Sequence, residues 1–456
     1  MKPVKLISAI LLSSVILSLP SCSAKDKNTD ETGTPTGITS AVTDVTDNTE
    51  DIPAENTLGL LEENLTDSLF NYGLVAVKVG DKWGFINEKG EMVIEPQLVR
   101  SDKFRQGVIA VNEDGKYRFM NTKGEWVAEP ADGIASFFTE DYCVVRTLRY
   151  DDNGNAVAMQ NKLIDSSGRV AIELPENVEC WPVRDGMFFS RNETGIAIYS
   201  TDGEKLISLD GFRVFAGDES TYKVIFDGVF CAENDESGKW GIVDTNGNWI
   251  VEPKFDSIGY FEDGLAYAYE GELCGFINTK GEWVVEPKFK KDIYHFSEGL
   301  AAVEFDDGRA GYIDKDGNMV ITLDGYEWVL AWEFDEGVAS VLTDKGAGII
   351  DKTGGWIVSP SYHSIGRFNC GIAPIEPEFG KHGFINSKGE IITGTDYRTT
   401  EYFYDDGYGV AMKPDGKWVI VDTEGNVVID GGFDGIGHYY TYYDEDGSVM
   451  PCATGR

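Results

Sequence analysis

The chain has 456 residues, of which 42% are hydrophobic and 26% charged, and its 78 acidic and 39 basic side chains give a formal charge of −39 at pH 7. Nucleic acids and anionic lipid headgroups are bound through Lys and Arg contacts to phosphate, so this charge excludes both as partners. The charge is typical of an acidic, solvated surface, and attraction to cations or cationic polymers is the alternative.

The first 22 residues have the pattern of an export signal. Lys2 and Lys5 precede an apolar stretch, residues 6–19, that is too short to span a bilayer comfortably. The sequence Leu-Pro-Ser-Cys at 19–22 resembles the lipobox of bacterial lipoproteins, which implies that Cys22 becomes the lipid-modified first residue. We therefore expect an exported protein at the cell surface, held on a bacterial membrane only through its lipid anchor. An ordinary secretory signal is the alternative.

Three regions follow the signal. Residues 23–57 are rich in Thr, Asp, Glu and Ser and nearly lack aromatic residues, so they are predicted to form a disordered acidic tether. Residues 58–72 are predicted to form an N-terminal cap with a short helix, since four leucines fall roughly on one helical face. Residues 73–456 are predicted to be an array of about ten repeats.

A glycine marks each repeat, and successive markers are 34 to 44 residues apart: Gly90, Gly124, Gly168, Gly203, Gly247, Gly281, Gly317, Gly354, Gly389 and Gly425. Asp, Asn or Ser stands three residues before every marker. Such a side chain accepts a backbone hydrogen bond within a tight turn, and glycine tolerates the left-handed conformation that closes the turn. Each copy is therefore predicted to contain a β-hairpin.

The strands around this turn follow from residue type. The incoming strand is of the type Trp-Gly-Phe-Ile-Asn at 83–87 and the outgoing strand of the type Trp-Val-Val-Glu at 283–286. Another strand precedes the hairpin after a Phe-x-x-Gly sequence, and a short fourth strand is left open. Proline after the outgoing strand, as at Pro287, is predicted to end it. The glycine after tryptophan, as at Gly84, is predicted to avoid a collision with the neighbouring copy.

These motifs resemble those of WG-repeat (KWG-repeat) proteins, a bacterial and often exported class, from residue 73 to about 440. The resemblance implies an interaction module without an assigned chemistry. A lone three-stranded unit cannot cover both faces of its sheet, so the copies must stack on one another. The expected fold is all-β: tandem repeats of three- to four-stranded antiparallel units, in a propeller-like ring or an open β-superhelix, with the ring favoured.

Catalytic and metal-binding motifs are absent from the sequence. The four histidines fall at different places within their copies, and no H-E-x-x-H, G-x-S-x-G or phosphate-binding glycine loop occurs. No cofactor is expected, because Asp- and Gly-rich stretches such as 314–318 lack the complete spacing of a calcium loop. The six cysteines after Cys22 have no C-x-x-C spacing and are expected to be mostly free, packed thiols.

We therefore expect a monomeric binding or scaffolding module, not an enzyme, with a protein or glycan ligand outside the cell. The alternatives are an extracellular glycan hydrolase that uses paired carboxylates and a passive surface spacer. Two spacings of 44 residues, before Gly168 and before Gly247, mark insertions that are interpreted as longer hairpins. Insertions in repeat arrays often lie on the binding face. The candidate recognition surface is bordered by Tyr150, Asp151, Asp152, Asn153, Tyr222, Phe226 and Phe230.

Overall fold

The computed structural model describes residues 68–437, except 101, 128, 152–155, 185, 215–224, 263, 290–294 and 305–309, together with 442–443 and 449–450. The predicted signal and tether, most of the predicted cap and Cys452 lie outside the described residues. Regular structure in the described residues is β-strand without helix, so no helix there is suited to cross a membrane. All strand pairs are antiparallel, and the all-β prediction is confirmed.

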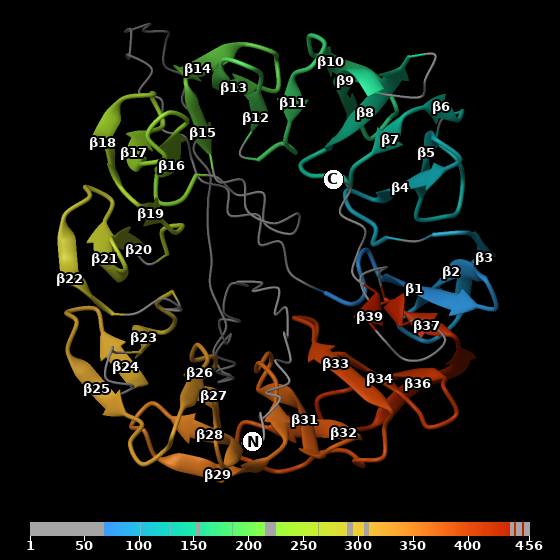
Figure 1. The fold of residues 1–456 in the computed structure, drawn as a ribbon. Coiled ribbons are helices and arrows are strands. Elements are labelled where there is room, and N and C mark those ends of the chain that lie inside the picture. The colour runs from blue at the N-terminus through green and yellow to red at the C-terminus, as the bar shows by residue number, and fades with distance from the viewer. Residues whose placement is uncertain are drawn as a thin grey trace, which may run out of the picture.

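Ten small sheets, which we call blades 1 to 10, follow one another in chain order around a closed ring (Figure 1). In the described residues, seven blades have four strands and three have three. In every four-stranded blade except blade 1, the first strand lies toward the centre of the ring and the last lies at its rim. The fold is thus a β-propeller, and the open superhelix is excluded.

The strands are assigned to blades as follows. Blades 1 to 3 contain β1 (Leu74–Val79), β2 (Lys82–Asn87), β3 (Met92–Leu98) and β37 (Gly435–Ile436); β4 (Val108–Glu113), β5 (Lys116–Asn121) and β6 (Ala131–Asp132); and β7 (Ile134–Ala135), β8 (Tyr142–Tyr150), β9 (Ala156–Asp165) and β10 (Val170–Glu173). Blades 4 to 6 contain β11 (Glu179–Cys180), β12 (Met187–Arg191), β13 (Gly195–Ser200) and β14 (Lys205–Asp210); β15 (Phe212–Val214), β16 (Val229–Asn234), β17 (Trp240–Asp244) and β18 (Trp249–Phe255); and β19 (Ser257–Ile258), β20 (Leu265–Glu270), β21 (Leu273–Asn278) and β22 (Trp283–Phe289).

The remaining blades complete the ring. Blades 7 and 8 contain β23 (Leu300–Glu304), β24 (Ala310–Asp314) and β25 (Met319–Thr322); and β26 (Val329–Ala331), β27 (Val338–Thr343), β28 (Gly346–Asp351) and β29 (Trp356–Tyr362). Blades 9 and 10 contain β30 (Ser364–Ile365), β31 (Ile372–Glu378) and β32 (Lys381–Asn386); and β33 (Thr399–Phe403), β34 (Gly409–Met412), β35 (Trp418–Val421) and β36 (Val427–Phe433). The strands β38 (Tyr442–Tyr443) and β39 (Val449–Met450) pair with each other.

The ring is closed by a strand from the far end of the chain. In β37, Gly435 and Ile436 pair with β1, so blade 1 takes its innermost strand from the last repeat. Asp406 in blade 10 also accepts hydrogen bonds from the backbone N–H groups of Leu69 and Phe70, at 3.1 and 2.9 Å. The described end of the predicted cap is therefore packed between the first and last blades.

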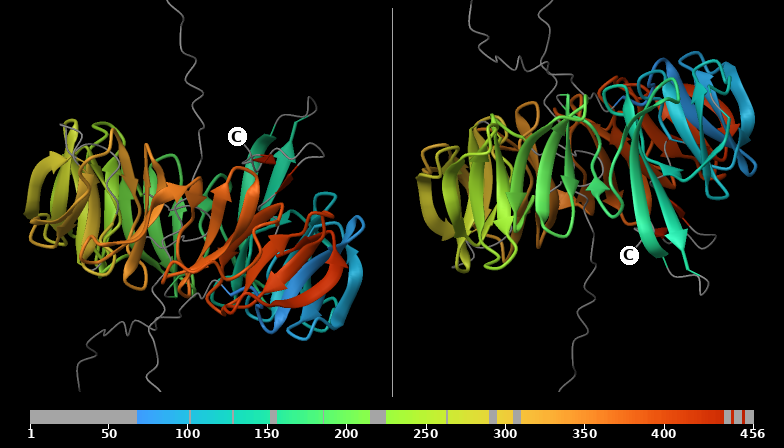
Figure 2. Two further views of the ribbon diagram at one scale, coloured as in Figure 1. Left: turned by 90° about the horizontal axis from the view of Figure 1, so that it is seen from below. Right: turned by 90° about the horizontal axis from the view of Figure 1, so that it is seen from above.

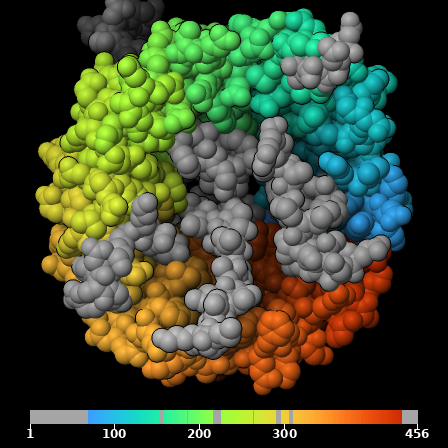
Figure 3. Space-filling view, in the orientation of Figure 1, coloured from blue at the N-terminus to red at the C-terminus, as the bar shows by residue number. Residues whose placement is uncertain are grey.

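The hydrophobic core is divided among the interfaces between blades. Ten clusters of buried side chains occur in the described residues, one between each pair of consecutive blades. The tenth joins Val410 and Ile420 of blade 10 to Val75 and Ile86 of blade 1. The blades therefore pack side by side around the ring (Figure 3), and each depends on its neighbours for burial, as in other repeat proteins.

The marker turns form as predicted in all ten copies. In blade 1 the N–H of Gly90 donates to the carbonyl of Asn87 at 2.8 Å, and the N–H of Lys89 donates to the Asn87 side chain at 3.0 Å. The marker glycine also contacts the preceding blade. A Cβ added to Gly281 would lie 2.3 Å from Cγ2 of Val251 in blade 5, so this glycine is the one that prevents a collision with a neighbouring copy.

The glycine after tryptophan has a different role from the predicted one. A Cβ added at the equivalent Gly275 would lie 2.2 Å from the carbonyl oxygen of Val285 and 2.8 Å from the nitrogen of Pro287, both in β22 of the same blade. The predicted collision with a neighbouring copy is therefore wrong for this position. Because it has no side chain, the glycine leaves room for the backbone of the outer strand of the same blade.

The prediction that proline ends the outgoing strand is also wrong. Pro287 lies inside β22, and the pairing shifts from Phe276 opposite Val285 to Cys274 opposite Phe289, so β22 bulges by two residues. A bulged strand at the rim can contain proline without losing a ladder hydrogen bond. This bulge brings the backbone over the glycine.

The cysteine prediction is confirmed for the five described cysteines after Cys22, which are thiols that form no disulfide: Cys143, Cys180, Cys231, Cys274 and Cys370. Cys274 is fully buried at the position where other copies have tryptophan. It therefore acts as a small core side chain.

A candidate ligand-binding groove

The first insertion forms a long hairpin in blade 3, as interpreted from the sequence. Its strands β8 and β9 have 9 and 10 residues and remain paired as far as Tyr150 and Ala156. In side view this hairpin extends beyond the neighbouring blades (Figure 2). Tyr150 is 59% exposed near its end, and Asp151 is half-buried. Asp152 and Asn153 lie outside the described residues.

The second insertion is placed differently from the prediction. The strand β16 begins 26 residues after the marker Gly203, whereas β20 begins 18 residues after Gly247, so most of the extra chain precedes β16 instead of lengthening its hairpin. That interval includes residues 215–224, which lie outside the described residues together with Tyr222.

The two phenylalanines near this insertion pack between blades. Phe230 is 1% exposed in the cluster between blades 4 and 5, so the prediction that it borders a recognition surface is wrong. Phe226 stacks on Tyr260 of the next blade, with ring centroids 5.0 Å apart. Phe226 precedes the second strand of its blade and Tyr150 ends the second strand of its own, so the two lie toward opposite faces of the ring.

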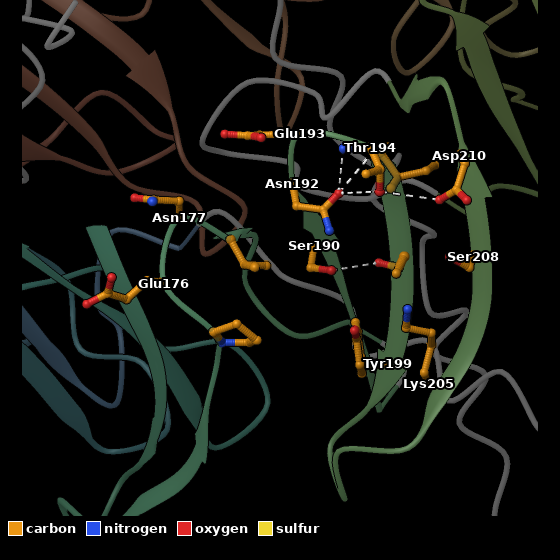
Figure 4. A pocket seen from close by; sticks show the side chains of 15 residues that line it. Glu176, Asn177, Ser190, Asn192, Glu193, Thr194, Tyr199, Lys205, Ser208 and Asp210 are labelled. Carbon is orange, nitrogen blue, oxygen red and sulfur yellow. Dashed lines mark hydrogen bonds between the residues drawn. The ribbon is translucent and has the colours of Figure 1, made fainter. Parts of the chain in front are cut away.

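A groove of about 550 Å³ lies between blades 3 and 4, beside the long hairpin (Figure 4). One wall is the loop 175–178, between β10 and β11. The other wall is the face of β12, β13 and β14 that is turned toward blade 3. None of its lining residues was among the candidates from the sequence.

Small side chains form the floor of the groove. Ser190 is 3% and Ala197 8% exposed, and the Ser190 hydroxyl donates to the carbonyl of Ala197 at 3.3 Å. Ala197 stands where a regular repeat has the glycine after tryptophan. It pairs directly with Ser208, because β14 does not bulge there. The regular register leaves room for the alanine Cβ, and the three small side chains leave space between the blades.

Polar groups surround the floor. The side-chain oxygen of Asn192 accepts hydrogen bonds from the backbone N–H groups of Thr194 and Gly195, at 2.9 and 3.2 Å, which fixes the amide. Its Nδ2 has no hydrogen bond within the part of the chain that the structure describes. The Thr194 hydroxyl donates to the same Asn192 oxygen at 2.9 Å and lies 3.4 Å from a carboxylate oxygen of Asp210, and Lys205 lies at the other end of β14.

The long hairpin supports the loop wall of the groove. The N–H of Asn177 donates to the carbonyl of Met159 in β9 at 2.7 Å, and the N–H of Met159 donates to the Asn177 side chain at 3.0 Å. Arg149, near the end of β8, pairs with Glu176 of the loop at 3.0 Å. Because these contacts join the hairpin to the wall, the insertion and the groove form one structural unit.

A second, smaller cavity of about 290 Å³ lies in blade 2. Arg118 stands there in place of the glycine after tryptophan, and its guanidinium lies 3.3 Å from the centroid of a Trp126 ring. Both cavities thus occur in blades that depart from the repeat motif at the same position.

Half-buried carboxyl groups with a raised pKa lie elsewhere, in the loop between β26 and β27 of blade 8. Burial raises the pKa of Asp335 to about 6, with the Arg367 guanidinium acting in the opposite direction. Burial also raises the pKa of Glu333, which pairs with Arg367 at 2.9 Å. Glu333 and Arg367 join blades 8 and 9, so they serve the packing of the ring. Within the described ranges, no three His, Cys, Asp or Glu side chains are grouped to hold a metal ion.

Comparison with known protein families identifies the regular copies of the repeat. Six segments match the family described as "WG containing repeat": residues 83–117, 240–274, 275–308, 311–345, 348–376 and 383–418. The chain is a WG-repeat protein. The unmatched interval 118–239 of this WG-repeat protein contains the long hairpin, the groove and the cavity-lining residues Arg118 and Trp126.

Solved structures that resemble the WG-repeat chain do so at low identity. BamB from Moraxella catarrhalis has a TM-score of 0.33 at 11% identity, covering 62% of this chain and 91% of that chain. Hsv2 from Kluyveromyces lactis has a TM-score of 0.29 at 10% identity, covering 54% and 90%. The C-terminal WD40 domain of Sif2 has a TM-score of 0.27 at 14% identity, covering 60% and 87%. Among curated proteins no sequence matches this chain.

Proposed function

We propose that this WG-repeat protein is an exported, lipid-anchored binding module that captures a protein or glycan of the envelope or extracellular space. Capture occurs at the groove between blades 3 and 4 and the long hairpin beside it. The observation that carries the proposal is the location of both features in the interval 118–239, where the repeat motif fails while the ring continues. Small-molecule and recognition sites are concave and few per protein, which fits a single modified sector.

The anchor is part of the same proposal. Cys22 is the lipidation site, residues 23–57 are the tether, and the propeller is displayed beyond the membrane as a monomer without a cofactor. The acidic sequence supports this arrangement, since a chain of charge −39 is repelled by anionic lipid headgroups and needs a covalent anchor to stay at a membrane.

The alternatives have less support. A glycan hydrolase needs a carboxyl group held protonated as the acid. The described carboxyl groups with a raised pKa lie between the first two strands of blades 8 and 10, away from the groove: Glu333, Asp335, Glu336 and Asp406. A passive spacer requires neither a groove nor a hairpin that extends beyond the ring.

Two experiments test the proposal. Metabolic labelling with radioactive palmitate should mark the full chain in a bacterial host and should not mark a Cys22→Ser variant; labelling of both, or of neither, contradicts the anchor. For capture, the full chain in detergent is immobilised and exposed to envelope extract and a glycan array. A variant with residues 150–156 replaced by Asn-Gly should lose the captured ligand.

The matched control for capture is Phe379→Ser, which changes an 85% exposed side chain at the hairpin end of blade 9. This control should bind as the unmodified chain does. Equal capture by the shortened hairpin, or no specific ligand for the unmodified chain, rejects the groove and hairpin as a capture site.

A further inference from the structure

The polar groups of the groove are spread over three adjacent strands. Ser190 is on β12, Tyr199 on β13, and Ser208 on β14, all lining the same space (Figure 4). Ser190 and Ser208 are both opposite Ala197, on either side of β13, and Tyr199 is two residues further along β13, so the three hydroxyl groups are spread over the floor. The Ser190 hydroxyl donates to the carbonyl of Ala197 and can still accept a hydrogen bond. This set of polar groups suits a ligand with several hydroxyl groups of its own.

The charges of the groove favour a neutral ligand. Lys205 stands at one end of β14 and Asp210 at the other, Glu193 lines the groove between β12 and β13, and the carboxylate of Glu176 is paired with Arg149. An anionic ligand would meet Asp210 and Glu193, and a cationic one along β14 would meet Lys205. A neutral ligand can accept from Lys205 and donate to Asp210 with hydroxyl groups at its two ends.

Backbone pairing disfavours an extended peptide. The floor strand β13 is paired with both β12 and β14, so the groove lies on the face of a sheet whose backbone groups are already bonded. A peptide that adds a strand needs an open sheet edge. The ligand must therefore be recognised by side chains.

The groove also offers a rigid aromatic surface. The Tyr199 ring stacks on the fully buried Phe188, with centroids 5.3 Å apart and an interplanar angle of 10°. This stacking fixes a half-buried ring beside a floor made of Ser190 and Ala197. A flat ligand ring can lie over small floor residues and contact the aromatic ring. The volume of about 550 Å³ is within the range of roughly 300 to 1,000 Å³ for small-ligand pockets.

We propose that the groove between blades 3 and 4 binds a short segment of a neutral sugar chain. Asn192 Nδ2 and Asp210 hold one end, and Tyr199 and Lys205 hold the other. This assignment rests on the proposed function and names its ligand class.

The test uses the full chain in detergent and titration calorimetry with three neutral series, cello-, manno- and chito-oligosaccharides of two to six residues. Ser208→Tyr places a large side chain in the groove. Leu206→Tyr is the matched control, since Leu206 is an exposed neighbour on β14 that does not line the groove. We expect at least one neutral series to bind the unmodified chain. Its affinity should fall at least tenfold in Ser208→Tyr and should be unchanged in Leu206→Tyr. Thermal unfolding of each variant shows whether the ring is intact.

Acidic oligogalacturonate and cationic oligolysine are the comparison probes. Binding of either one in the groove, with the neutral series inactive, overturns the sugar assignment. Absence of any neutral binding also overturns it, and the capture experiment above then decides separately whether the binding module stands. Equal weakening in Ser208→Tyr and Leu206→Tyr shows that the sugar binds elsewhere and likewise overturns the assignment.

Discussion

Replacing Gly275 with alanine tests the physical reason for the glycine of the repeat motif. The added Cβ would lie 2.2 Å from the carbonyl oxygen of Val285 and 2.8 Å from the nitrogen of Pro287. Both are backbone atoms of β22, so no side-chain rotation relieves the contact, and the strand must move by roughly 1 Å to restore ordinary separations. Overpacking of this kind costs about 1 to 3 kcal/mol. We expect Gly275→Ala to lower the free energy of unfolding by an amount at the upper end of this range, about 3 kcal/mol.

The matched control is Gly271→Ala in the same blade. Gly271 has a φ of +67°, and an added Cβ there would have no atom within 4 Å, so the substitution costs only the left-handed conformation, about 1 to 2 kcal/mol. Urea unfolding monitored by tryptophan fluorescence gives both free energies of unfolding. Gly275→Ala should lower the midpoint more than Gly271→Ala does. An unchanged midpoint for Gly275→Ala, or a larger loss for Gly271→Ala, would refute the explanation.

Three further outcomes are expected. Asp406→Ala leaves the N–H groups of Leu69 and Phe70 without their acceptor, which costs about 1 to 3 kcal/mol and should appear as faster hydrogen exchange of these two amides; unchanged exchange contradicts the role of Asp406 in closure. The raised pKa of Asp335, about 6, means that its contribution to stability is complete below its ordinary pKa of 3.8 and is lost as the pH rises through 6. Asp335→Asn should therefore have a free energy of unfolding about 3 kcal/mol higher than that of the unmodified chain at pH 7.5, measured by urea unfolding, and the gain should largely disappear at pH 4; a pH-independent effect contradicts this. Burial raises the pKa of the Cys143 and Cys180 thiols, so a thiol reagent such as DTNB at pH 8 should react with these two residues only after unfolding; rapid reaction of either one in the folded chain contradicts this.

Local features of the repeat could be predicted from the sequence because they depend on neighbouring residues. The turn at Asn87 and Gly90 needs only a side-chain acceptor and a left-handed glycine three residues apart, and all ten turns form. Ring closure could not be predicted, since the partner of β1 is Gly435–Ile436 at the far end of the chain. The bulge at Pro287 could not be predicted from the sequence either, because a proline is compatible with both a strand end and a bulge.

The candidate site was only partly predictable. A spacing of 44 residues revealed the long hairpin, since an insertion changes an otherwise regular count. The groove depends on Ser190, Ala197 and Ser208, which are ordinary strand residues until pairing places them on one face. The only sequence signal was Ala197 in place of glycine. The burial of Phe230 was not predicted, because the register of the pairing decides which side of β16 faces a neighbouring blade.

The regular repeat and the groove exclude each other at any one interface. In a regular blade the bulged outer strand lies over the glycine, as Val285 does over Gly275, and its β-branched side chains fill the contact with the next marker glycine, as Val285 does against Gly317. Opposite Ala197 that bulge is given up, and a space is open between blades 3 and 4. The groove thus lies in the interval 118–239 that departs from the motif, while the regular blades from residue 240 onward and the closure through β37 maintain the ring.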